Sequence, residues 1–199
     1  MNPHLRPVGL PLQTQAAEGL PRRCWSVAEI EEMVRVGIID ADERFELIGG
    51  EVVPMSPKGN RHEVVKVALN LHWARMLPAE LRFATETTFR LSADTYVDPD
   101  VVVYPRACGL AGLAAATALL VVEIADTSLG YDLGRKAALY AAFGVTEFWV
   151  IDATRLETHV HRDPAVDGYR SIAVISTDRR VVPARVPALA VVLSELDFD

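Results

Sequence analysis

The sequence predicts a mixed α/β domain with a central mixed β-sheet flanked by α-helices. Short runs of β-branched residues, of which 101–104 is the clearest, predict strands. Segments with apolar residues at helical spacing lie between these runs and predict helices. Of the 199 residues, 50% are hydrophobic and 24% are charged, which is typical of a globular domain with one core and excludes a disordered or coiled-coil chain.

The chain is long enough for one domain, which we expect over residues 23–199 after a mobile, Pro-containing arm over residues 1–22. The arm has no apolar stretch of the kind that a secretory signal needs. Cys24 and Cys108 match no CxxC pattern, so reduced thiols and a cytoplasmic location are favoured over a disulfide. The longest mostly apolar run is about half the length of a membrane span, so we expect no membrane association.

The beginning of the domain is predicted to form one helix followed by a β-hairpin. Ser26 and Glu29 have the spacing of a capping box, so a helix should begin at Ser26 and end at Gly37. Residues 45–48 and 51–53 are strand-like runs on either side of a Gly-Gly pair, which is the signal of a two-residue hairpin turn.

The remainder is predicted to contain a long helix, several strands and a second helix. Asn60 followed by Glu63 can cap a helix that runs to about Met76. Its apolar stripe would consist of Val64, Val67, Ala68 and Leu71, and because Val65, Leu69 and Trp73 lie beside the stripe, we expect the helix to be buried broadly. The second helix is expected over 132–143, ending at Gly144. Strands are expected over 82–91, 101–104, 119–124, 147–151, 156–161 and 169–175, in one sheet.

The charge of the chain is acidic overall and uneven along its length. The net charge is −7, which argues against a protein that coats nucleic acid by bulk electrostatics. Residues 58–90 nevertheless carry six basic and three acidic side chains. A locally basic face on an acidic protein is therefore permitted.

Three charged residues lie where the apolar pattern predicts burial. Asp100 opens the strand over 101–104, Glu123 interrupts another strand, and Lys136 falls in the apolar stripe of the second helix. Because buried charges are costly unless they are paired or bound to a metal, the simplest explanation is that the three side chains meet. Two carboxylates at neighbouring strand ends can hold Mg²⁺, and a lysine beside them can orient an attacking water, which suits phosphodiester hydrolysis.

Each of these residues also has a structural explanation that spacing alone leaves open. Asp100 follows a proline and would fit a turn. Glu123 would fit a solvent-facing position on an edge strand. Lys136 would fit an apolar face from which its ammonium reaches water.

Several longer motifs resemble those of the Uma2 family, also called DUF820. They are FELIGGEVVPMSP over 45–57 followed by Arg61-His62, VDPDVVV over 97–103, VEIADTSLGYD over 122–132, then Lys136, Tyr140, Gly144-Val145, and EFWVID over 147–152. Together these motifs extend the resemblance over roughly residues 25–196, which is nearly everything except the arm. Several linked motifs in the same order make the resemblance more specific than any one of them.

The resemblance implies a restriction-endonuclease-like core of the PD-(D/E)xK kind and a nuclease activity that depends on Mg²⁺ or Mn²⁺. Pro99-Asp100 matches the PD half of the signature, and Glu123 matches the (D/E) position. The residue two positions after Glu123 is Ala125 rather than lysine. In Uma2-like proteins the lysine lies on the following helix, where this chain has Lys136, in agreement with the stripe.

The resemblance also points to Glu46, Arg61 and His62. Glu46 would be the additional acidic residue that the superfamily supplies from its N-terminal part, although a solvent-facing hairpin glutamate is an equal explanation. Arg61 and His62 would form a basic pair at a helix N-terminus, where they can contact a phosphate, or His62 can assist proton transfer. Ordinary surface residues at a helix start would also explain them.

The leading hypothesis is an endonuclease that hydrolyses DNA, with Asp100 and Glu123 as ligands of Mg²⁺ or Mn²⁺ and Lys136 positioning or activating water. A homodimer would supply two sites for the two strands of a duplex. The alternative is a nuclease-fold module that binds nucleic acid or a protein partner without cleaving, which the acidic charge favours. A hydrolase of small phosphodiesters fits the same carboxylates.

Overall fold

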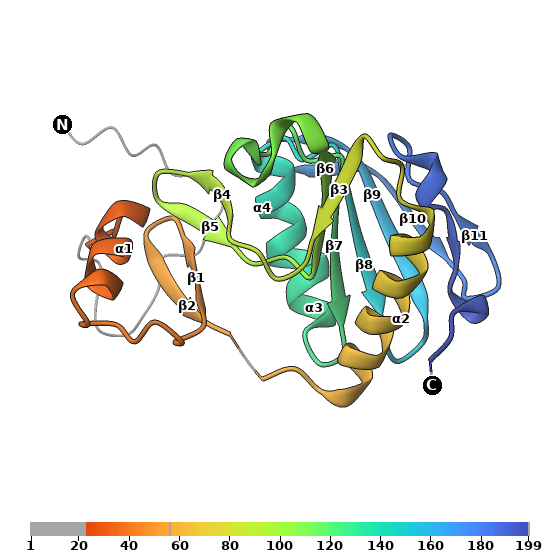
Figure 1. Cartoon of the computed structure of the whole chain (residues 1–199), viewed down its shortest axis with the longest axis horizontal. Coiled ribbons are helices and arrows are strands. Elements are labelled where there is room, and N and C mark those ends of the chain that lie inside the picture. Colours follow the sequence, from red (N-terminus) through yellow and green to blue (C-terminus); the bar gives the residue numbers. More distant parts are fainter. Residues whose placement is uncertain (1–22, 56, 199) are drawn as a thin grey trace. The chain divides into compact units, whose positions relative to one another are not determined.

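The computed structural model describes residues 23–55 and 57–198, so the predicted arm over residues 1–22 lies outside the described residues (Figure 1). The described residues form two compact units. The N-terminal unit comprises residues 23–55 and 88–98, and the main unit comprises residues 57–87 and 99–198. Each unit has a sheet of its own.

The N-terminal unit consists of one helix and a four-stranded sheet of order β2-β1-β5-β4. Its elements are α1 (Val27–Arg35), β1 (Phe45–Ile48), β2 (Glu51–Pro54), β4 (Phe89–Ser92) and β5 (Thr95–Val97). Ser26 caps α1 in a complete capping box with Glu29, as predicted. The hairpin is confirmed too, because β1 and β2 pair around Gly49 and Gly50, whose φ angles of 59° and 78° are those that a type I′ turn requires.

The main unit is built on a six-stranded mixed sheet of order β10-β9-β8-β7-β6-β3. Its strands are β3 (Leu81–Ala84), β6 (Val101–Pro105), β7 (Leu120–Ala125), β8 (Glu147–Asp152), β9 (Glu157–Ala165) and β10 (Gly168–Ile175). Strand β7 pairs antiparallel with β6 and parallel with β8. The crossover between β7 and β8 is helical and consists of α3 (Leu129–Tyr131), the π-helical segment η4 (Asp132–Lys136) and α4 (Ala137–Ala142).

Helices cover both faces of this sheet (Figure 1). Successive side chains of a strand point to opposite faces. On β8, the ring of Trp149 lies 6.2 Å from that of Trp73, which belongs to α2 (Asn60–Met76). The ring of the preceding residue, Phe148, lies 4.7 Å from that of Tyr140 on α4. The two helices therefore pack on opposite faces, and the main core lies between α2 and the sheet.

Shorter elements complete the main unit. They are the two-stranded sheet of β11 (Arg180–Val181) and β12 (Val191–Val192), and the 3₁₀ turns η2 (Arg106–Cys108), η3 (Leu110–Gly112), η5 (Pro187–Leu189) and η6 (Leu193–Glu195). None of the helices in the described part of the chain combines the length and the apolar character that a membrane span needs.

The long helix α2 has the predicted extent but a different cap and a different buried face. Its N-cap is Gly59 rather than Asn60, and no side chain caps it. Of the predicted stripe only Ala68 is buried, and the prediction was wrong for Val64, Val67 and Leu71, which are exposed. The buried residues of α2 are His62, Val65, Ala68, Leu69 and Trp73. Apolar residues recur on two sides of this helix, and only packing against the sheet decided which side is covered.

Two predictions about strands were also wrong. The single strand expected over 82–91 is two strands, β3 and β4, which belong to different sheets. Between them Glu86 has a φ of 48°, a left-handed conformation that ends an extended segment and that the alternating pattern does not reveal. The expectation of one sheet was therefore too simple, although the central sheet flanked by helices is present.

Candidate active site

Asp100 and Glu123 are neighbours across two adjacent strands of the main unit. The register of β6 and β7 pairs Val101 with Val122, so Asp100, one residue before β6, continues that register opposite Glu123. The Ile124 N–H donates to Asp100 Oδ2 at 2.7 Å, which holds the strands together at this end. Both carboxylates project from the same face and are buried, with exposed fractions of 3% and 4%.

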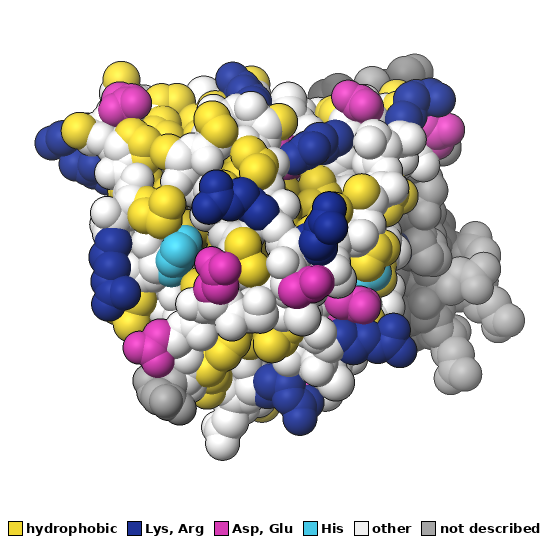
Figure 2. Space-filling view, turned by 90° about the vertical axis from the view of Figure 1, so that its right-hand side faces the viewer, with side chains coloured by type: hydrophobic (Ala, Val, Ile, Leu, Met, Phe, Trp, Pro, Cys, Tyr) yellow, Lys and Arg dark blue, Asp and Glu magenta, His cyan; other side chains and the backbone are white. Residues whose placement is uncertain are grey.

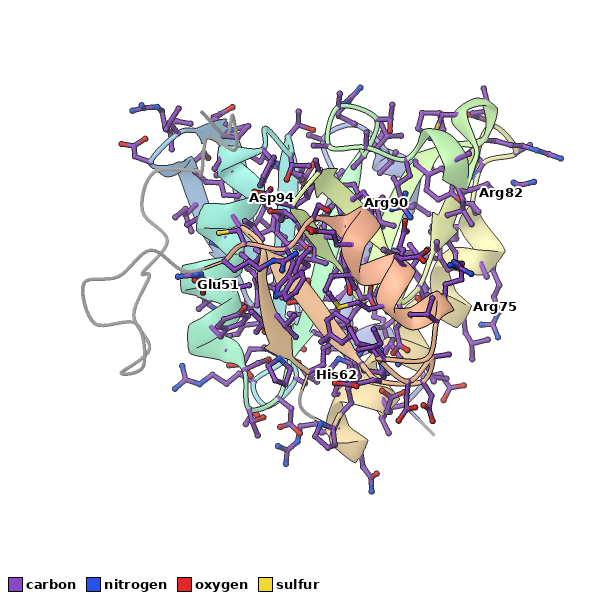
Figure 3. All side chains as sticks on the ribbon, turned by 90° about the vertical axis from the view of Figure 1, so that its left-hand side faces the viewer. Glu51, His62, Arg75, Arg82, Arg90 and Asp94 are labelled. Atoms are coloured by element: carbon purple, nitrogen blue, oxygen red, sulfur yellow. The ribbon has the colours of Figure 1, made fainter. Side chains whose placement is uncertain are left out.

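Asp100 is held by two further groups from the beginning of α2 and the segment before it. His62 lies in the first turn of α2 (Figure 3), and its Nε2 is 2.9 Å from Asp100 Oδ2. Lys58 Nζ lies 2.5 Å from Asp100 Oδ1. Burial raises the pKa of Asp100, but the hydrogen bond and charge of His62 and the charge of Lys58 outweigh it and lower the pKa to about 2. Asp100 is therefore an ionised carboxylate at neutral pH.

Glu123 bonds to two side chains of the helical crossover. Lys136 Nζ and the Tyr140 hydroxyl each donate to Glu123 Oε1 at 2.9 Å. Lys136 points inward, as its place in the apolar stripe predicted, and it ends the π-helical segment η4. Such π-helical turns are common at functional sites, because the extra residue in the turn changes where the following side chains point. The ammonium of Lys136 is thus held beside the carboxylates, while its chemical role stays a prediction.

A second cluster of charges, which the sequence reasoning missed, adjoins Asp100. The Glu86 carboxylate accepts bonds from Lys58 at 2.8 Å and from Lys66. Lys66 also pairs with Glu63. Burial raises the pKa of Glu86, but its bonds to the two lysines outweigh this and lower the pKa to about 2. The polar run at the start of α2 was the available signal, yet it does not show that Glu86, some twenty residues away, belongs with it.

The other predicted residues occupy different environments. Glu46 lies in the N-terminal unit, where it is buried rather than solvent-facing and accepts a bond from the Asp98 N–H at 3.2 Å. Arg61 is exposed and donates to Asp126, just after β7, at 3.0 Å. His62 is buried on Asp100 rather than on the surface. The site in the main unit thus brings together Asp100, Glu123, Lys136 and His62.

The donor set suits a hard divalent cation that keeps part of its water shell. Within the described residues, no group of three or more His, Cys, Asp or Glu side chains is arranged to hold a metal. Mg²⁺ is nevertheless commonly bound through one or two carboxylates, together with waters and substrate phosphate oxygens. Asp100 and Glu123 supply two such carboxylates, so these residues fit Mg²⁺ or the similar Mn²⁺.

Comparisons with known proteins identify the family of the chain and support its fold. The model of the Uma2 family, described as "putative restriction endonuclease", matches residues 27–194. A crystal structure described as a "putative nuclease belonging to DUF820" from Anabaena variabilis superposes with a TM-score of 0.64 at 15% sequence identity, covering 85% of this chain and 96% of that chain. The comparison with curated proteins finds no match. The resemblance predicted from the motifs and the predicted fold class are both confirmed.

Proposed function

Since the chain belongs to the Uma2 family, we propose that it is a metal-dependent endonuclease that hydrolyses phosphodiester bonds of DNA. The observation that carries this proposal is the buried pair of Asp100 and Glu123 on adjacent strands, with the Lys136 ammonium 2.9 Å from Glu123. These three residues are the ones that match the PD, (D/E) and lysine positions of the motif. A buried charge cluster made of those residues is expected of a nuclease centre.

Each residue has a proposed role. Asp100 and Glu123 would hold Mg²⁺ or Mn²⁺, which would lower the pKa of water and offset charge on the phosphate. Lys136 positions or activates the attacking water through its ammonium, and Glu123 and Tyr140 restrict where that ammonium lies. His62 orients the Asp100 carboxylate, because its ring nitrogen donates to Oδ2.

Substrate contacts are proposed to be few and local. The chain carries a net charge of −7, and on the face that Figure 2 shows, basic side chains are interspersed with acidic and hydrophobic ones. That face offers no continuous basic surface for a duplex. Arg61, whose side chain is 57% exposed at the start of α2, is the predicted phosphate contact, since a helix N-terminus and a guanidinium both favour an anion.

The direct test is cleavage of supercoiled plasmid by the wild-type protein and the Glu123→Gln variant, in Mg²⁺ and separately in Mn²⁺. We expect metal-dependent cutting by the wild type alone. Asp167→Asn, an exposed carboxylate on the β9–β10 turn, is the matched control and should cut like the wild type. If the protein is a homodimer with two sites, linear product should accompany nicked product. Equal cutting by Glu123→Gln would contradict the proposed site.

The non-cleaving module remains a second candidate because of one observation. Both oxygens of Asp100 already accept bonds from groups of the protein itself, namely Lys58, His62 and the Ile124 N–H. A closed network of this kind also suits a structural role. Salt-dependent DNA binding that Lys136→Ala leaves unchanged, with no product in any metal, would favour this candidate.

A further inference from the structure

The proposed function leaves the position of Lys58 unexplained. Its ammonium lies 2.5 Å from Asp100 Oδ1 and 2.8 Å from Glu86 Oε1, and only 16% of its side chain is exposed. It therefore bridges two carboxylates, one of which is the proposed metal ligand. A cation already occupies one side of Asp100.

The second carboxylate, Glu86, is held in place by contacts other than Lys58. Lys66 also bonds to it, and the Glu86 N–H donates to the carbonyl of Pro99 at 3.0 Å. The φ of Glu86 is 48°, a left-handed conformation that a non-glycine residue keeps only where its surroundings impose it. The loop thus presents a fixed carboxylate next to the residue that precedes Asp100.

The carboxylates around the site are already paired with ammonium groups. Lys58 pairs with Asp100 and Glu86, Lys136 pairs with Glu123, and Lys66 pairs with Glu86 and Glu63. A divalent cation would bring two further positive charges, and its repulsion from an ammonium is greatest where both contact the same oxygen. On Asp100, the Lys58 ammonium bonds to Oδ1, whereas His62 and the Ile124 N–H bond to Oδ2.

We propose that Lys58 is a built-in counter-ion of Asp100, which competes with the divalent metal for Oδ1 and transfers fully to Glu86 when the metal binds. The inference rests on the proposed function, since it takes Asp100 as a metal ligand. The flexible four-carbon side chain of lysine permits this movement. The bond to Glu86 keeps the ammonium paired afterwards, so its burial stays compensated. Lys58 is therefore a positioning residue that sets the metal affinity of the site.

The test is a calorimetric titration of the protein with Mn²⁺ in the absence of DNA. Lys58→Met should bind Mn²⁺ about tenfold more tightly than the wild type, because the competing charge is gone. Lys66→Met is the matched control. This variant removes a lysine charge that pairs with Glu86 and Glu63 but not with Asp100. Its affinity for Mn²⁺ should therefore differ from that of the wild type by about twofold or less. In thermal melts, Mn²⁺ should raise the Tm of Lys58→Met by more than that of the wild type.

Unchanged or weaker Mn²⁺ binding by Lys58→Met, or a gain equal to that of Lys66→Met, would overturn the inference. Lys58→Gln, which keeps a polar group for the two carboxylates, is the second variant if Lys58→Met does not fold. Asp100→Asn separates the two proposals in the same titration. If Asp100→Asn binds Mn²⁺ like the wild type, the metal site itself is wrong. If it loses binding while Lys58→Met shows no gain, only the role of Lys58 is wrong.

Discussion

Two buried glutamates lie on neighbouring parallel strands, Glu123 on β7 and Glu147 on β8. Their carboxylates accept hydrogen bonds from different kinds of donor. Their exposed fractions are 4% and 1%. Glu147 accepts bonds from the Trp149 indole at 2.8 Å, from the Arg162 guanidinium at 2.7 and 3.0 Å, and from the Ala184 N–H at 2.7 Å. Glu123 accepts bonds from the Lys136 ammonium and the Tyr140 hydroxyl.

We propose that the kind of donor, rather than burial alone, distinguishes a functional carboxylate from a structural one. An indole, a guanidinium and a backbone N–H are rigid donor groups, so they hold a carboxylate in one position. At Glu147 these donors also connect β8, β9 and the segment near residue 184. An ammonium on a flexible stem and a rotatable hydroxyl can exchange partners during a reaction. We therefore interpret Glu147 as structural and Glu123 as part of the site.

The largest expected effect is on cleavage. Lys136→Gln keeps a donor toward Glu123 but lacks the ammonium, so we expect plasmid cleavage to fall at least 100-fold, or about 3 kcal/mol in the barrier. The rate of loss of supercoiled plasmid in Mg²⁺ measures it. Arg135→Gln removes a charge from the neighbouring residue and is the matched control. A loss below tenfold would mean that Lys136 does not take part in the chemistry.

The next effect is on stability. Glu147→Ala leaves the Trp149 indole and the Ala184 N–H without an acceptor, and it unpairs Arg162, which is 36% exposed and therefore partly screened. We expect a loss of about 2–3 kcal/mol in the free energy of unfolding, or a fall of about 5–10 °C in Tm. Urea and thermal unfolding measure it. If Glu147→Ala melts like the wild type, rigid donors do not distinguish the two glutamates.

A third, smaller effect should follow pH in the presence of EDTA. The pKa of Glu86 falls from 4.5 to about 2 on folding, and that of Asp100 from 3.8 to about 2. A carboxyl with a lowered folded pKa contributes stability above its unfolded pKa and loses that contribution as pH falls toward the folded value. Stability should therefore decline between about pH 5 and pH 2. Replacing Glu86 by Gln should make the decline shallower by on the order of 1–2 kcal/mol, and an identical acid profile would contradict the assignment.

The smallest effect concerns the hydroxyl of Tyr140. Tyr140→Phe removes one donor to Glu123 and keeps the ring that packs 4.7 Å from Phe148. We expect a loss of about 1 kcal/mol in stability and a few-fold loss of cleavage, since Lys136 still holds Glu123. Parallel melts and plasmid assays measure both. A cleavage defect as large as that of Lys136→Gln would make Tyr140 a member of the reacting set instead.

Much of the fold could be predicted because it depends on local chemistry. The capping box at Ser26, the Gly-Gly hairpin and the β-branched strand over 101–104 each follow from a few adjacent residues. The division of 82–91 into two strands could not be predicted, since it depends on one backbone angle at Glu86. The buried face of α2 could not be predicted either, because this helix has apolar residues on two sides.

For the candidate site, Asp100, Glu123 and Lys136 could be recognised from the sequence alone, because each breaks an apolar pattern. A charged side chain is costly to bury, so a charged residue within an apolar run can be recognised in the sequence without any knowledge of its contacts. Which of these charges meet depends on how distant segments of the chain pack together. The bonds of Asp100 to Lys58 and His62 and the bridge from Lys58 to Glu86 join segments 28 to 42 residues apart. Such pairings form when the start of α2 and the loop that follows β3 pack at one end of the sheet. The charged side chains find their partners only through that packing.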